Sequence, residues 1–192
     1  MDSRYLPEGS VLDPDRDEQL IKGLAKYASA AGIAGNKEYI WQSVKNTEWI
    51  TKQDIAVVRL IPFKKHNSMG AYYNGMALSR LTKKFMMLTG LLVRHYMDAR
   101  YVSRVSLFKD LQEGLEAGGK VLFIPDWYVS SRKGVKNSVL PQWMRDIVLS
   151  FLLESQAEGR DIIMGIHDWA AAEEHYGPEI MSFIENNFKE VE

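Results

Sequence analysis

Apolar residues recur along this chain in two patterns, one typical of helices and one typical of buried strands. A spacing of three and four residues predicts helices over residues 17–31, 78–97, 107–115, 141–158 and 178–188. Continuous or alternating apolar runs predict strands over residues 69–75, 99–105, 120–126 and 161–166. This alternation favours an α/β fold, a three-layer parallel sheet with helices on both faces, whose ligands bind at the carboxyl ends of the strands.

The length and composition limit the number of domains and the chemistry. A chain of 192 residues with 46% apolar content builds one substantial core and has no room for a second full domain. It contains no cysteine, which excludes disulfides, thiolate catalysis and cysteine-ligated zinc. The start of the chain is polar and acidic, and no segment approaches eighteen uncharged apolar residues. We therefore expect a soluble, cytoplasmic protein without membrane contact.

Charge is distributed unevenly along the chain. Residues 61–145 hold 14 Lys and Arg against 5 Asp and Glu, whereas residues 146–192 hold 2 against 11. A basic middle suits a phosphate backbone, because its neutralisation supplies most non-specific affinity for nucleic acid. The equally good alternative is that both runs are solvated helix faces that pair with one another.

Two local motifs and the order of the elements carry a resemblance to a known family. The motifs are LLESQAEGRDII at residues 152–163 and YGPEIMSF at residues 176–183. From Gly70 onward the chain resembles the AAA+ ATPase domain of replicative helicase loaders of the DnaC, DnaI and IstB type, a P-loop NTPase fold. The resemblance covers residues 32–192. It implies that residues 1–31, an N-terminal helical segment, form the candidate contact with a partner.

The phosphate loop of that family departs from its consensus here. Such a loop needs glycines whose N–H groups wrap the phosphates, a lysine for the β/γ oxygens and a Ser or Thr for magnesium. One register, GAYYNGMA at residues 70–77, keeps both glycines and lacks the lysine and hydroxyl. The preferred register, GMALSRLT at residues 75–82, keeps Gly75 and Thr82 and replaces the lysine with Leu81. We expect tight ATP binding to be lost and no cofactor, although ATP with magnesium stays possible through Arg80, Lys83 or Lys84.

The other catalytic positions that the resemblance implies are also altered. Asp126 falls where the family holds magnesium, and Trp127 replaces the second acid that would polarise water. His167 is the candidate for the polar residue that ends the next strand. A metal site built from His167, Asp168 and His175 lacks a fourth ligand. Four aromatic side chains are candidates for base stacking, with Trp143 the most core-like of them: Trp127, Tyr128, Trp143 and Trp169.

Three functions remain open on these residues. The first is a DNA replication accessory protein that resembles a helicase loader and acts as a pseudo-ATPase, binding a replicative helicase, single-stranded DNA or further copies of itself. The second is an active ATP-dependent loader with an atypical phosphate loop, in which Asp126 is catalytic. The third is a phage-type inhibitor that mimics a loader to block a host helicase. Candidate contacts to single-stranded DNA are Arg80, Lys83, Lys84, Arg100 and Arg104.

Overall fold

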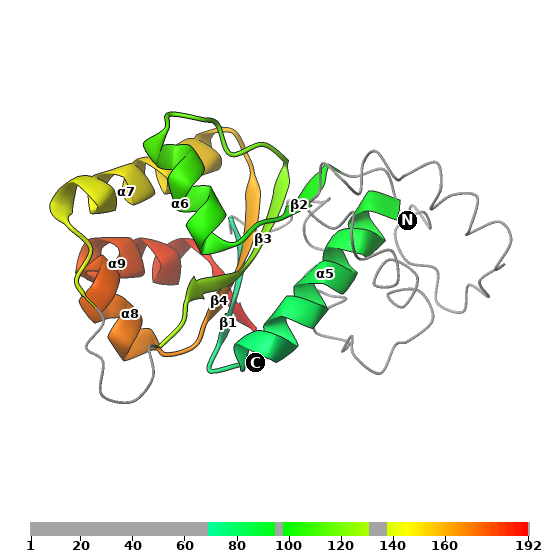
Figure 1. The fold of residues 1–192 in the computed structure, drawn as a ribbon, viewed down its shortest axis with the longest axis horizontal. Coiled ribbons are helices and arrows are strands. Elements are labelled where there is room, and N and C mark those ends of the chain that lie inside the picture. Colours follow the sequence, from blue (N-terminus) through cyan, green and yellow to red (C-terminus); the bar gives the residue numbers. More distant parts are fainter. Residues whose placement is uncertain (1–68, 95–97, 131–137, 192) are drawn as a thin grey trace, which may run out of the picture.

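A five-stranded parallel sheet forms the centre of the protein (Figure 1). The computed structural model describes residues 69–94, 98–130 and 138–191. The strands are β1 (Gly70–Asn74), β2 (Ala99–Tyr101), β3 (Val121–Tyr128), β4 (Asp161–Ile166) and β5 (Lys189–Val191). The helices are α5 (Leu78–Arg94), α6 (Arg104–Gln112), α7 (Gln142–Ala157), α8 (Trp169–Tyr176) and α9 (Pro178–Asn187). The helix predicted over residues 17–31 lies outside the described residues.

The strand order places β4 between β1 and β3. The full order is β2-β3-β4-β1-β5, and every neighbouring pair is parallel. In register, Asn74 of β1 and Tyr128 of β3 both lie opposite Ile166 of β4. The carboxyl ends of three strands are therefore adjacent, and the predicted parallel α/β fold is confirmed.

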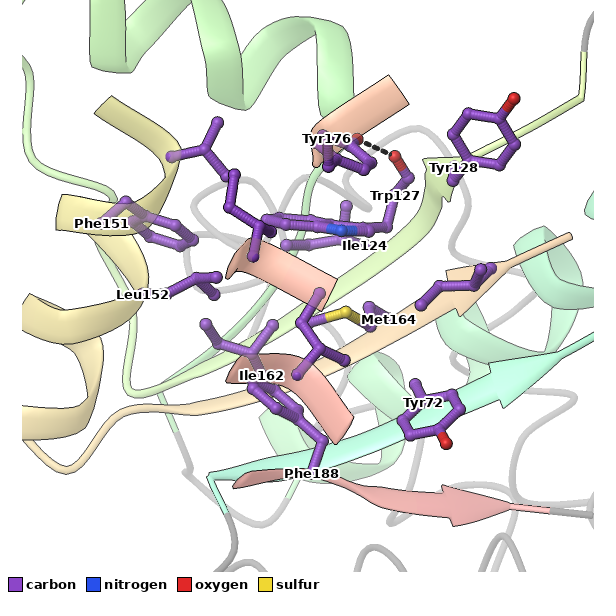
Figure 2. Close-up of a cluster of buried hydrophobic side chains, with 14 of the residues drawn as sticks. Tyr72, Ile124, Trp127, Tyr128, Phe151, Leu152, Ile162, Met164, Tyr176 and Phe188 are labelled. Carbon is purple, nitrogen blue, oxygen red and sulfur yellow. Dashed lines mark hydrogen bonds between the residues drawn. The ribbon is translucent and has the colours of Figure 1, made fainter. Parts of the chain in front are cut away.

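The two faces of the sheet are covered by different helices. On one face α5 contributes Phe85, whose ring lies 5.3 Å from Tyr73 of β1 and 5.6 Å from Phe123 of β3. The opposite face carries α6, α7, α8 and α9 (Figure 1). Here the core includes Ile162 and Met164 of β4, packed with residues of these helices (Figure 2). Because successive strand residues point to opposite faces, both sides of β3 and β4 are apolar.

Several element boundaries differ from the sequence-based expectation. The strand expected to reach Val105 ends at Tyr101, because the Ser103 hydroxyl accepts a hydrogen bond from the Ser106 N–H (3.2 Å) and starts α6. The strand expected to end at Asp126 continues to Tyr128, with irregular pairing between Ile124 and Tyr128. Pro125 has no N–H to donate to the ladder, which accounts for an interruption there. The short strand β5 was not predicted.

Two tryptophans differ from expectation in how far they are exposed to solvent. Trp143, predicted to be core, is 55% exposed, whereas Trp127, a predicted stacking platform, is 0% exposed. The buried side of α7 is formed by Met144, Val148 and Phe151, among others. Trp143 precedes Met144 by one residue, about 100° around the helix, and so lies outside that side. The prediction for Trp143 was wrong.

Within the described residues, no helix combines the length and the apolar character that are needed to cross a membrane.

Replacement of the two tryptophans by alanine will separate core packing from surface exposure. Trp127→Ala removes a fully buried ring that stacks on Tyr176, and we expect it to lower the free energy of unfolding by about 3–5 kcal/mol. Trp143→Ala, the matched control, should change it by less than about 0.5 kcal/mol. Urea unfolding followed by circular dichroism measures both. Equal losses in the two variants would contradict the packing described here.

Candidate functional site

The carboxyl edge of the sheet is the place where a parallel α/β fold binds its ligands. At this edge β1 leads into α5 through Gly75, Met76 and Ala77 alone. Gly75 has φ 71°, a left-handed conformation that favours glycine and turns the chain at the strand end. Its N–H donates to the carbonyl of Ile166 in β4 (2.9 Å). The turn is therefore tied to the neighbouring strand.

This connection does not have the form of a phosphate loop in either register. In the first register, residues 70–74 belong to β1. In the preferred register, residues 78–82 belong to α5, and the N–H groups of Arg80 and Leu81 donate to the Ala77 carbonyl (both 3.0 Å). Backbone N–H groups that close a helical turn are not available to wrap a phosphate. A three-residue connection leaves no extended cradle for one.

Leu81, which takes the lysine position in the preferred register, is a core residue. It is 1% exposed. A Cβ added at Gly165 of β4 would lie 2.6 Å from Leu81 Cδ1 and 2.3 Å from the Pro125 carbonyl oxygen. The leucine thus packs against the carboxyl-end halves of β3 and β4. The space that a phosphate-binding lysine would cross is filled by apolar atoms.

The basic residues of α5 do not share one surface. Arg80 and Lys83 are exposed, and Thr82 is half-buried. Lys84 is only 4% exposed, and its Nζ lies 5.2 Å from the centre of the Tyr73 ring. A cation over an aromatic face is an attractive arrangement. Lys84, a predicted contact to phosphate or single-stranded DNA, is thus turned toward β1 by its position on α5.

Asp126 is hydrogen-bonded to the start of a helix. Its Oδ1 accepts a hydrogen bond from the backbone N–H of Arg104 at the start of α6 (2.7 Å). A carboxylate beside the first turn of a helix also complements the helix dipole. The next residue, Trp127, is buried against Tyr176, with ring centres 5.6 Å apart. In this arrangement Asp126 fixes α6, and the residue after it belongs to the core.

Arg100 and Arg104, the other candidates for contact with nucleic acid, lie on β2 and at the start of α6. The guanidinium of Arg100 packs on Gly118, where an added Cβ would lie 2.4 Å from Nη1. Gly118 precedes β3, so this contact is near the amino end of the sheet. Arg104 is half-buried and starts α6. The five predicted contacts to single-stranded DNA therefore do not form one surface. Among them, only Arg80 and Lys83 are both exposed and close to each other on one helix.

An aromatic and histidine cluster, which the sequence did not reveal as a unit, lies where the carboxyl ends of β3 and α8 meet. The Tyr176 hydroxyl donates to the Trp127 carbonyl (Figure 2). The His175 ring lies 5.5 Å from the Tyr128 ring, and its Nδ1 lies 2.6 Å from the Ser138 carbonyl oxygen. Burial raises the pKa of Tyr128, and the nearby charge of Asp168 raises it further. Tyrosines at a spacing of 48 residues give no recognisable sequence signal, so only the fold brings this cluster together.

Two of the three hypothetical metal ligands of this region, Asp168 and His175, have other partners. Asp168 Oδ1 accepts the Ala171 N–H (3.1 Å) at the start of α8, and its Oδ2 accepts the Ser130 hydroxyl (3.4 Å). His175 is engaged with Ser138, as above. Among the residues that the structure describes, no group of three His, Asp or Glu side chains could hold a metal ion.

No protein-family model, no curated protein and no solved structure matches this chain.

His175 makes the stability of the protein depend on pH. Burial lowers its pKa below the ordinary 6.5, although the bond to the Ser138 carbonyl opposes this shift. The folded state therefore binds fewer protons than the unfolded state as the pH falls below about 6.5, and stability decreases in that direction. His175→Asn should flatten this decrease, as measured by urea unfolding at a series of pH values from neutral downward. An unchanged pH profile in the variant would contradict the assignment.

Proposed function

We propose that this chain is a DNA replication accessory protein of the helicase-loader type that binds its partners without turning over ATP. The observation that carries the proposal is the combination of a three-residue β1–α5 connection with a buried Leu81 beside Gly165. The parallel α/β sheet is consistent with the proposed nucleotide-binding type of fold, and core packing fills the place where that fold would need a phosphate-binding lysine.

The order of the strands supports the resemblance to AAA+ domains. Here β1 lies between β4 and β5. In the Rossmann order β1 lies beside β2 and β4, and in the flavodoxin-like order it lies beside β2 and β3. Neither order fits this sheet. Exclusion of these two layouts leaves the AAA+ type, which the two sequence motifs suggest, as the proposed one.

The altered catalytic positions support the binding role over the enzymatic one. A P-loop ATPase holds magnesium with an acid that faces the phosphates. Asp126 instead accepts the Arg104 N–H at 2.7 Å, and its neighbour Trp127 is fully buried. Single-stranded DNA is the partner that suits the exposed pair Arg80 and Lys83, which stand on the first turns of α5 beside the carboxyl edge. A replicative helicase is the second proposed partner, through residues 1–31.

Calorimetric titration with ATP and ADP in magnesium tests the loss of nucleotide binding. We expect no heat at millimolar nucleotide, because the β1–α5 connection offers no cradle. Leu81→Lys should not restore binding, and it should lower the free energy of unfolding because it buries a charge. Micromolar binding that disappears in Asp126→Ala or Lys83→Ala would instead identify an active loader.

Charge reversal on α5 tests the contact with DNA. Arg80→Glu with Lys83→Glu should weaken binding to a fluorescent single-stranded oligonucleotide about tenfold at low salt and reduce its salt dependence, because two phosphate contacts are removed. Fluorescence anisotropy measures both. The matched control is Lys109→Glu with Lys189→Glu, which makes the same change in net charge at exposed positions on α6 and β5. Equal weakening in the control would remove the assignment to α5.

A further inference from the structure

A groove of about 390 Å³ runs between α7 and the loop that joins α6 to β3. The helix lines it with Ile147, Phe151 and Glu154, and Glu158, the residue that caps the helix, continues the same helical spacing. The loop lines it with residues 114–117. Because this loop precedes β3 and α7 ends just before β4, the groove lies toward the amino ends of the strands. It is thus separate from the carboxyl edge considered above.

The floor of the groove is apolar and partly open to solvent. Phe151 is 3% exposed, whereas Leu115 is 53% exposed. Leu115 is held in place, because its N–H donates to the Asp110 carbonyl (2.9 Å) after a turn at Gly114 with φ 69°. An exposed leucine fixed at the side of a groove is a suitable contact for an apolar side chain of a ligand.

The rim of the groove is acidic and poorly neutralised. Its carboxylates belong to Glu116, Asp146, Glu154 and Glu158. The basic residue in the lining, Arg160, already pairs with Glu158 through Nη2 and Oε2 (2.7 Å). Glu116 and Glu154 make no side-chain hydrogen bond or ion pair with the residues that the structure describes. The groove therefore attracts cations and repels phosphates.

We propose that this groove binds a basic amphipathic helix of a partner protein. The lining of α7 from Ile147 to Glu158 extends over about three helical turns, roughly 16 Å, which matches a helix of similar length. An apolar side chain of that helix contacts Leu115 and Phe151, and its lysines or arginines meet the carboxylates of the rim. Helices that place an apolar face in a groove are a recurring mode of recognition, and charge complementarity selects among them.

A labelled model peptide tests the groove on the full chain. The probe is a fluorescein-labelled peptide of about 14 residues in which leucine and lysine follow an amphipathic helical pattern. Its comparison peptide has glutamate in place of every lysine. We expect the lysine peptide to bind saturably at one site in an anisotropy titration, and the glutamate peptide not to bind. Absence of saturable binding of the lysine peptide would overturn the proposal.

Two sets of variants locate the binding. Glu116→Lys with Glu154→Lys should weaken it about tenfold or more, and Leu115→Ser, which changes no charge, should also weaken it several-fold. The matched control is Glu173→Lys with Glu174→Lys, which alters net charge equally at exposed positions on α8. Its binding should stay within about twofold of the unaltered protein. If this control weakens peptide binding as much as the groove variant does, the effect is due to net charge alone, and the proposal is overturned.

The alternative occupant, a second copy of this chain, has its own outcome. Sedimentation velocity of the unaltered protein and of the Glu116→Lys, Glu154→Lys variant compares their association. We expect the same sedimentation for both. If the unaltered protein associates with itself and the variant does not, the groove is an interface between copies, and the partner assignment is overturned. All groove variants alter exposed positions, and their thermal unfolding should match that of the unaltered protein.

Discussion

The close approach of α5 to β3 and β4 at Gly165 determines the arrangement of the carboxyl edge. The glycine leaves room for the Pro125 carbonyl and for Leu81, both of which would be closer than 3 Å to a Cβ at that position. One turn later, Phe85 packs between Tyr73 and Phe123. With these contacts α5 is in place on the sheet from its first turns, so the chain has only three residues in which to pass from β1 into the helix. Core packing occupies the space that a phosphate-binding lysine at position 81 would need.

The sequence predicted the interior strands well and the outer ones less well, for a physical reason. Val121 to Ile124 and Ile162 to Ile166 are buried on both faces, so they form continuous apolar runs. The three residues of β5 include exposed Lys189 and Glu190 and give no such signal. Helical spacing located α7 correctly, yet it misplaced Trp143, because the sequence of an isolated helix shows an apolar side without showing how wide the buried part of it is.

For the candidate site, the sequence shows which residues of the family's consensus are missing, but it does not show how the remaining side chains are arranged. The absence of a lysine at position 81 and of a second acid at position 127 is visible in the sequence. The hydrogen-bond partner of Asp126 is not visible in the sequence. Arg104, whose N–H donates to Asp126, is 22 residues away and comes close only because the chain passes from β2 into α6. Lys83 and Lys84 are consecutive lysines, and the sequence alone gives no reason to distinguish them. In the fold one is exposed and the other is buried above Tyr73, since neighbouring helix positions differ by about 100°.

The outer strands of the described sheet, β2 and β5, are only three residues long, whereas β3 between them has eight. A long open edge would offer a row of unpaired backbone groups on which another chain could add a strand. Edges this short provide few such groups. At the β5 edge, the charged side chains of Lys189 and Glu190 further disfavour the addition of a strand. The described part of the sheet therefore offers little room for an added strand, and the side-chain surfaces of its helices and loops offer more.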